Sequence, residues 1–319
     1  MTSNSDVPEL SLRTLSYLLI VIEEGSFTAA ARRLGISQPA LSHQIRSLED
    51  TLGGPVLERF SHGVRPTDAG KALIPEAEGA IACALRAARA TRAALTGNPI
   101  GLEISTFPSL ATGMLLSPIS LWHSRFPGAV LRLSEFRHRG RLEQSVAHGT
   151  GDIAFGSLPT NWEGSKRLVG RESFRAVLPP NDPLLAKSGP IQLELLATRP
   201  WILLEPDYGL ADLVTSACDH LGFSPNGIIE TSQAEAAARL AGAGLGVTLV
   251  PSRNLPMEVR SQSRPTSPAF VWDIWAYSRA DWPPQALRFL EILAETHPLT
   301  PQIPNSIRIG PRVLQHESR

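Results

Sequence analysis

Apolar residues in the first part of the chain repeat at helical spacing in three short runs. Leu12, Leu15, Leu18, Leu19 and Ile22 predict a first helix that ends near Gly25. Ser26 then precedes a second run, Phe27–Leu34, and can act as its N-cap. After the turn at residues 35–37, Ser37 can cap a third helix. Pro39 fits the first turn of that helix because its position donates no intrahelical hydrogen bond.

One long alanine-rich helix is predicted from Asp68 to Leu95, with its apolar residues along one stripe: Leu73, Ala77, Ile81, Ala84, Leu85, Ala88 and Leu95. A single helix cannot bury such a stripe alone. We therefore expect a partner helix, most simply from a second copy of the chain, with packing inside the same chain as the alternative. Pro75 should kink this helix or mark a ragged start. Residues 97–101, Gly-Asn-Pro-Ile-Gly, have the composition of a hinge.

From Leu102 onward short apolar strands alternate with helices, which predicts an α/β sheet domain. Strands are expected at Leu102–Thr106, Ala129–Phe136, Asp152–Phe155, Phe174–Leu178, Trp201–Leu204, Gly227–Glu230, Val247–Val250 and Phe270–Tyr277. Helices are expected at Leu110–Arg125, Arg141–His148, Leu210–Leu221, Gln233–Ala241 and Pro284–Glu295. The tail after His297 repeats proline without periodicity, so it is expected to be a loosely packed extension.

Composition narrows the class of protein but does not identify it. A chain of 319 residues with 42% apolar and 19% charged residues can form two or three folded units. The net charge is zero, so any case for nucleic-acid binding must rest on local geometry. The two cysteines have no metal-ligand spacing, and neither a signal peptide nor a membrane-spanning run is apparent. We expect a cytoplasmic protein with no metal, no cofactor and no membrane partner.

Residues 27–46, F-T-A-A-A-R-R-L-G-I-S-Q-P-A-L-S-H-Q-I-R, meet the requirements of a helix-turn-helix. Ala30 and Ala31 allow the helices to approach closely, and the turn contains glycine. The open side of the third helix is predicted to carry Gln38, Pro39, Ser42, His43 and Arg46, which can reach base edges or phosphates. Thr28 and Arg32 are placed for phosphate contacts, with Ser37 at the turn. An ordinary helical hairpin with a solvated face is the alternative.

The wider sequence resembles the LysR-type transcriptional regulator family. The stretch G-S-F-T-A-A-A-R-R-L-G-I-S-Q-P-A-L-S-H-Q-I-R-S-L-E is similar to the recognition region of that family, L-G-G-P-V-L-E-R-F to the entry of its wing, and V-R-P-T-D-A-G-K to the exit into its linker helix. Later motifs follow in the family's order: R-F-P-G-A-V-L-R-L, G-D-I-A-F-G, N-D-P-L and A-G-A-G-L-G-V-T-L-V-P. The resemblance covers nearly the whole chain and is most specific in the first 70 residues.

This resemblance implies an α+β multidomain fold. It comprises an N-terminal winged helix-turn-helix (residues 10–67), a linker and dimerisation helix (68–96), a hinge (97–101), a C-terminal α/β regulatory domain (102–297) and a tail (298–319). The regulatory domain would have two subdomains that resemble periplasmic binding proteins, with the chain returning to the first near residue 268. Double-stranded promoter DNA and a small-molecule effector are the implied partners. The implied assembly is a homodimer that pairs into a homotetramer.

The resemblance also places Arg59 and Arg65 in the wing, near the phosphate backbone or minor groove. The chain departs from the family at His43, where arginine is common, and at the wing tip, Ser61-His62-Gly63, which lacks the usual basic pair. Six basic residues of the module stand against four acidic ones: Arg32, Arg33, Arg46, Arg59, Arg65 and Lys71 against Glu49, Asp50, Glu58 and Asp68. We therefore expect weak non-specific DNA binding with a shallow salt dependence.

Ligands of open α/β sheets bind outside the carboxyl ends of the strands. Applied here, this rule selects three turns that open helices, with candidate effector contacts at Thr106, Phe107, Pro108, Ser109, Tyr208 and Ser232, and with Phe155 at another strand end. Hydroxyl groups at helix starts suit a small carboxylate, although serines there are more often simple N-caps. Leu210 and Ala211 follow Gly209 where the family often has arginine, so no charge clamp for an effector carboxylate is expected at that position. Phe107, Phe155 and Tyr208 leave room for an aromatic or apolar ligand instead.

Other classes of protein are less consistent with the sequence. A cytoplasmic small-molecule-binding protein or an enzyme built on the α/β segment is the competing hypothesis. An enzyme of this type should show a nucleophile elbow or a phosphate loop, and neither motif is present. Gly242-Ala243-Gly244-Leu245-Gly246 precedes a strand, which is the wrong context for phosphate binding. Cys218 is expected inside a helix, so oxidant sensing through a reactive thiol is not expected. We therefore predict a non-enzymatic regulator.

Overall fold

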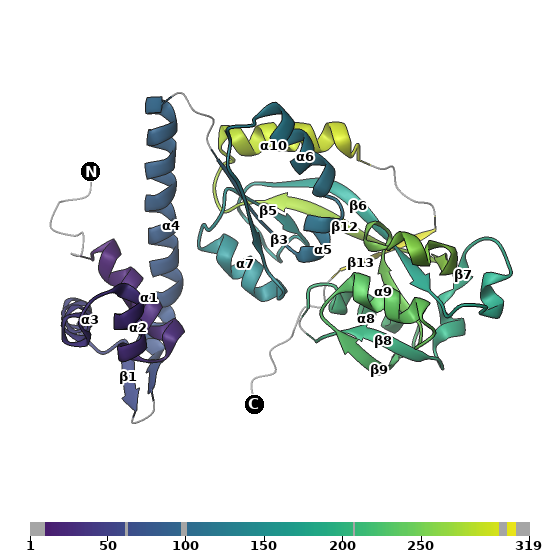
Figure 1. Ribbon diagram of the computed structural model, residues 1–319, viewed down its shortest axis with the longest axis horizontal. Helices are drawn as coiled ribbons and strands as arrows, with labels where there is room; N and C mark the ends of the chain where they lie inside the picture. The colour runs from purple at the N-terminus through teal and green to yellow at the C-terminus, as the bar shows by residue number, and fades with distance from the viewer. Residues whose placement is uncertain (1–9, 61–62, 97–100, 207, 300–304, 311–319) are drawn as a thin grey trace. The chain divides into compact units, whose positions relative to one another are not determined.

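A computed structural model of the protein describes residues 10–60, 63–96, 101–206, 208–299 and 305–310. These residues form two compact units: one contains the elements α1 to α4 and the other contains β3 to β13 (Figure 1). Most of the predicted hinge (residues 97–100) and two residues of the wing tip, Ser61 and His62, lie outside the described residues. In the part of the chain described, no helix is long and apolar enough to cross a membrane.

Three short helices form the base of the first unit: α1 (Leu12–Glu24), α2 (Phe27–Leu34) and α3 (Gln38–Leu52). The predicted caps are confirmed, because the Ser26 hydroxyl accepts from the amide of Ala29 and the Ser37 hydroxyl accepts from the amide of Ala40. Gly25, Gly35 and Gly53 end the three helices in the left-handed conformation that glycine adopts without strain. Local sequence signals thus determine the boundaries of all three helices.

A two-stranded wing follows, with β1 (Leu57–Phe60) antiparallel to β2 (Gly63–Pro66). The carboxylate of Glu49 accepts hydrogen bonds from the amides of Val56 and Leu57 at 3.0 and 3.2 Å, and so attaches α3 to the start of the wing. The wing is therefore held to the third helix by a side chain as well as by the chain itself.

The long helix α4 spans Asp68–Thr96 and contains Pro75 within it. The N-terminal half of its predicted apolar stripe packs inside the same unit, because Ala77 is buried and Leu73 and Ile81 contact the core of α1 to α3. Farther along the helix, Leu85 and Leu95 are exposed. Intrachain packing, the alternative in the sequence analysis, thus accounts for the first half of the stripe only.

The second unit is built on a twisted sheet with strand order β4-β3-β5-β12-β6-β11-β7, to which β10 and β13 add beside β6 and β12. Its strands are β3 (Leu102–Thr106), β4 (Leu131–Glu135), β5 (Ile153–Gly156), β6 (Lys166–Val177), β7 (Ile191–Gln192), β10 (Thr248–Pro251), β11 (Ser263–Ser267), β12 (Ala269–Tyr277) and β13 (Ser306–Ile309). A parallel pair is formed by β8 (Pro200–Leu204) and β9 (Asn226–Thr231), and Trp201 of β8 forms an isolated bridge with Val247, the residue before β10.

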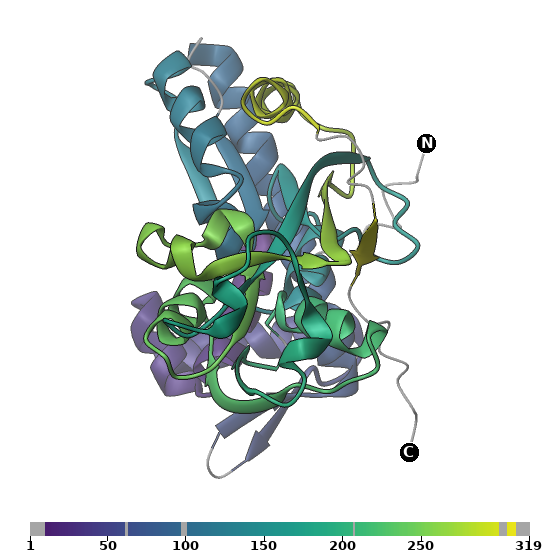
Figure 2. The ribbon, with the colours of Figure 1, turned by 90° about the vertical axis from the view of Figure 1, so that its right-hand side faces the viewer.

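Helices cover this framework in two lobes (Figure 1). The first lobe carries α5 (Pro108–Thr112), α6 (Leu116–Arg125), α7 (Arg139–Ala147) and α10 (Pro284–Thr296), and the second carries α8 (Ala211–His220), α9 (Ala234–Gly242) and the 3-10 turns η1 (Pro183–Leu185), η2 (Leu193–Leu196), η3 (Ser252–Asn254) and η4 (Met257–Gln262). Trp122 of α6 packs edge-on against Phe289 of α10. In Figure 2, helix α10 (yellow) lies above the green segments of the second lobe. The antiparallel strands β6 and β12 connect the lobes.

Three expectations about this unit were wrong. The helix predicted over Leu110–Arg125 is two helices, because Gly113 ends α5 and Pro118 is tolerated only in the first turn of α6. Strand β6 begins eight residues earlier than predicted, since its pairing with β12 stabilises a segment with weak alternation. The tail is not uniformly loose: β13 pairs in parallel with β12, and Ile309 is buried.

Candidate functional sites

The third helix presents a polar face to solvent. Gln38, Pro39, His43 and Arg46 are exposed on α3, and Ser37 is exposed at its cap. Thr28 and Arg32 are exposed on α2. The opposite face of α2 packs into the core through Ala30 and Ala31. These side chains were all predicted to lie on an accessible surface, and the structure places them there.

Ser42 is a correction to that prediction. It was expected on the open side of α3, but it is buried and its hydroxyl accepts a hydrogen bond from the Arg59 guanidinium at 3.2 Å. The same guanidinium lies over the ring of Phe27, 4.5 Å from its centroid. Arg59 therefore attaches the wing strand β1 to α2 and α3, and part of its donor capacity is used inside the protein. Arg65 on β2 stays exposed, near the ring of Phe60.

The basic residues of the first unit differ in how far their charge is already compensated. Arg33 makes salt bridges of 2.8 Å with both Glu23 and Glu24, so its charge is neutralised within the unit. Lys71 is paired with Asp68 at 2.8 Å. Among the described residues, Arg32, Arg46 and Arg65 form no salt bridge, and they remain available to an external anion.

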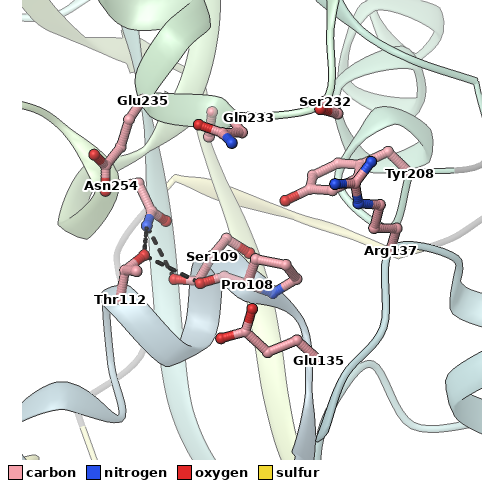
Figure 3. A pocket seen from close by; sticks show the side chains of 11 residues that line it. Pro108, Ser109, Thr112, Glu135, Arg137, Tyr208, Ser232, Gln233, Glu235 and Asn254 are labelled. Atoms are coloured by element: carbon pink, nitrogen blue, oxygen red, sulfur yellow. Dashed lines mark hydrogen bonds between the residues drawn. The ribbon is translucent and has the colours of Figure 1, made fainter. Parts of the chain in front are cut away.

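A cavity of about 360 Å³ lies between the two lobes of the second unit. It opens at the carboxyl ends of parallel strands, as expected for a sheet of this kind. Its volume falls in the range of small-molecule sites. The first lobe contributes Pro108, Ser109, Thr112, Glu135 and Arg137, and the second contributes Tyr208, Ser232, Gln233, Ala234, Glu235 and Asn254 (Figure 3).

Four of the predicted contacts line this cavity, namely Pro108, Ser109, Tyr208 and Ser232. The other three do not. The Thr106 hydroxyl donates to the carbonyl oxygen of Phe155 inside the sheet. Phe107 is buried against the backbone of Gly156 and Gly209, where a Cβ atom would lie about 3 Å or less from its ring. Phe155 packs edge-on against Phe289 in the core. Of the three aromatic residues predicted to contact the effector, only Tyr208 lines the cavity.

Seven lining residues were not predicted from the sequence, and all of them except Ala234 carry polar or charged groups. Glu135 ends β4 and Arg137 follows two residues later, while Asn254 follows β10. The signal was available, because β4 runs parallel to β3 and ends at the same edge of the sheet. Arg137 therefore gives the cavity a cationic side chain, although leucine occupies position 210, where the family often has arginine.

Three polar groups of the cavity have well-defined states. The Asn254 side-chain amide donates to the Ser109 carbonyl oxygen at 2.9 Å and to Thr112 Oγ1 at 3.2 Å, so its own oxygen is directed elsewhere (Figure 3). Ser109 is 5% exposed, and its hydroxyl has no hydrogen-bond partner among the described residues. Burial raises the pKa of Tyr208 to about 12, so the phenol stays neutral and can donate.

The thiols are separate from this cavity. Cys218 is fully buried on α8, and burial raises its pKa to about 12, which leaves it as an unreactive thiol. Cys83 is exposed on α4. In the described ranges, no group of three or more potential metal ligands occurs.

Comparison with known families gives two matches that together span most of the chain. The family model described as "Bacterial regulatory helix-turn-helix protein, lysR family" matches residues 12–71. The model described as "LysR substrate binding domain" matches residues 101–298, which include every residue that lines the cavity.

Individual relatives agree with these matches. The chain is 30% identical over 271 residues to a "Probable cat1 operon transcriptional activator" of Acinetobacter lwoffii, covering 82% of this chain and 89% of that protein. It is 32% identical over 256 residues to a "Probable hydrogen peroxide-inducible genes activator" of Mycobacterium leprae, covering 78% of this chain and 80% of that protein. The solved structure of full-length CbnR with its target DNA is similar in fold, with a TM-score of 0.65, 23% identity and coverage of 90% and 100% of the two chains.

Proposed function

Because this chain belongs to the LysR family, it is a DNA-binding transcriptional regulator, and we propose that it reads its operator through helix α3 and responds to a small molecule bound in the cavity between the lobes. The observation that carries the proposal is the exposed polar face of α3. Arg46 and Gln38 have the side chains that pair with guanine and adenine in the major groove.

Within this proposal the other exposed residues position the module on the duplex. Thr28, Arg32, Ser37, Pro39 and His43 flank the reading face, and Arg65 extends it from the wing. Arg59 contributes mainly by holding β1 against Ser42 and Phe27, which limits its contacts with phosphate. Few free cations mean few phosphate contacts, in keeping with weak binding by a single module.

Weak binding by one module is compensated by assembly. We propose that the exposed C-terminal half of α4, with Leu85 and Leu95, pairs with the same helix of a second chain. Dimers then pair through their regulatory domains into a homotetramer that contacts two adjacent DNA sites. An effector between the lobes changes their closure, and hence the spacing of the DNA-binding modules and the DNA bend.

A gel-shift assay tests the regulator function directly. The full-length protein is titrated against the DNA upstream of its own coding sequence and against a shuffled duplex of equal length and composition. We expect a clear preference for the upstream DNA. Equal affinity for both duplexes at moderate salt would contradict sequence-specific regulation at that promoter.

The similarity to peroxide-responsive activators suggests a second candidate, regulation by oxidation of cysteine. The environment of Cys218 argues against it, because a buried thiol with a raised pKa supplies little thiolate to react with peroxide. Incubating the protein with hydrogen peroxide before the gel-shift assay distinguishes the two. Unchanged DNA binding after peroxide treatment supports a metabolite effector. A change in DNA binding that peroxide causes in the wild type but not in Cys218→Ser supports oxidant sensing.

A further inference from the structure

The cavity between the lobes contains charges of both signs, with carboxylates in excess. Glu135 and Arg137 come from the first lobe, and Glu235 comes from the first turn of α9 on the second. In Figure 3 the two glutamates enter from different sides of the cavity, and Arg137 lies beside Tyr208. A ligand that fills this space meets two carboxylates and one guanidinium.

The charge of neither carboxylate is fully compensated within the protein. Among the described residues, Glu135 forms no hydrogen bond or salt bridge. Glu235 is 3.6 Å from Arg239, but Arg239 is shared with Glu258, which it contacts more closely at 2.8 Å. Carboxylates that face a concave site attract a ligand that brings a cation to them.

The uncharged polar groups of the cavity include both hydrogen-bond acceptors and hydrogen-bond donors. The amide nitrogen of Asn254 is committed to Ser109 and Thr112, which leaves its carbonyl oxygen as an acceptor for the ligand. Tyr208 is a neutral phenol that can donate. The Ser109 hydroxyl, more than nine-tenths buried and without a partner among the described residues, is a polar group that a ligand can satisfy.

We propose that the effector is a small zwitterion of the amino-acid type, whose protonated amine lies toward Glu135, Glu235 and the Asn254 oxygen and whose acid group lies toward Arg137. This inference rests on the proposed function, since it assumes that an effector occupies this cavity. A ligand that carries only carboxylates would place its charge among two glutamates with a single arginine to offset them. That arrangement is repulsive over most of the cavity.

The test uses the full-length protein and three matched sets of compounds in thermal-shift and calorimetric titrations. The first set is the standard amino acids, the second has the same skeletons with hydrogen in place of the α-amino group, and the third has the same skeletons without the carboxyl group. We expect at least one amino acid to bind while its deaminated and decarboxylated counterparts bind about tenfold or more weakly. Equal or tighter binding of a nitrogen-free acid would overturn the inference and leave an effector site in place.

Two variants tie the binding to the cavity. Glu135→Gln and Arg137→Gln should each raise the Kd of the bound amino acid about tenfold or more, because each removes one charged partner of the ligand. Glu135→Gln does so without changing the shape of the side chain. Glu194→Gln and Arg279→Gln change exposed residues that do not line the cavity and should leave the Kd unchanged. Binding that both cavity variants retain would contradict the inference. Binding by none of the three sets would overturn the effector function of this cavity together with the inference.

Discussion

The side-chain amide of Asn254 donates to the carbonyl oxygen of Ser109 over 2.9 Å and so joins the two lobes at the cavity. Replacing the donor by an acceptor in Asn254→Asp sets a carboxylate against this carbonyl oxygen. We expect the free energy of unfolding of the regulatory unit to fall by about 1–3 kcal/mol. Urea denaturation of the full-length protein measures the loss. Asn226→Asp, at an exposed position at the start of β9, is the matched control and should be nearly neutral.

Close backbone contact in the DNA-binding unit makes Gly70 intolerant of a side chain. A Cβ atom built there lies 2.1 Å from the carbonyl oxygen of Val56. Gly70→Ala should therefore force α4 away from the wing and destabilise this unit by about 1–3 kcal/mol. Gly54→Ala meets no atom within 4 Å and should cost much less. Equal stability of the two variants in thermal denaturation would show that the contact relaxes freely.

Substituting an arginine should affect DNA binding only where its charge is not already paired with a carboxylate of the protein. Arg46→Ala should weaken operator binding by about 1–3 kcal/mol, and Arg65→Ala should lower the slope of log K against log salt by about 1. Arg33→Gln serves as the control, because Glu23 and Glu24 already neutralise that residue. Fluorescence anisotropy at several salt concentrations gives both quantities. An Arg33→Gln loss as large as that of Arg46→Ala would contradict the assignment.

The buried carboxyl of Glu172 gives the regulatory unit a defined pH dependence. Burial outweighs the neighbouring Arg253 guanidinium and raises the pKa of Glu172 in the folded protein. The folded state then holds the proton more tightly than the unfolded chain, so this group's contribution to stability falls as pH rises from its ordinary pKa through the raised one. Glu172→Gln cannot ionise. Its stability relative to the wild type should therefore improve in urea denaturation as the pH rises above the ordinary pKa of a glutamate.

Glu295 provides a control of opposite sign for that experiment. It is exposed and paired with Arg125, which lowers its pKa below the ordinary value. Its stabilising contribution is present above the ordinary pKa and is lost as pH falls through the lowered one. Glu295→Gln should therefore not gain stability relative to the wild type as pH rises. A parallel response of both variants would rule out the assigned cause.

The C-terminal strand β13 predicts different effects for two truncations. Removing residues 311–319 leaves β13 whole and is the reference for a longer deletion. Removing residues 306–319 also deletes Ile307 and the buried Ile309, and it exposes one edge of β12. We expect this deletion to cost about 2–4 kcal/mol of unfolding free energy. Chemical denaturation of the two truncated proteins side by side tests the difference.

Sequence patterns predicted the structure best where the determining contacts are local. Ser26 and Ser37 were identified as caps because a cap bonds an amide three residues away. Ser42 was misplaced because its burial depends on Arg59, seventeen residues later, which no helical periodicity reports. The position of β13 depends in the same way on pairing with a strand that ends almost thirty residues earlier.

The rule that ligands bind outside the carboxyl ends of parallel strands predicted the position of the cavity better than the residues that line it. Ser109, Tyr208 and Ser232 come after strands and line the cavity. Thr106 and Phe155 belong to the strands themselves, and their side chains make contacts inside the domain instead. Glu135 and Arg137 were missed because β4 was not considered as a contributing strand, although its register beside β3 places them at the same edge.

The pairing of β6 and β12 also constrains the order in which the protein can fold during synthesis. The contacts that bury the core of α1 to α3 lie within the first 81 residues, so that core can close while the ribosome is still making the rest of the chain. The central pair β6–β12 joins residues about a hundred positions apart, and β12 receives β13 only after residue 309 has been made. A nascent chain therefore carries a folded DNA-binding core well before it has a finished regulatory unit.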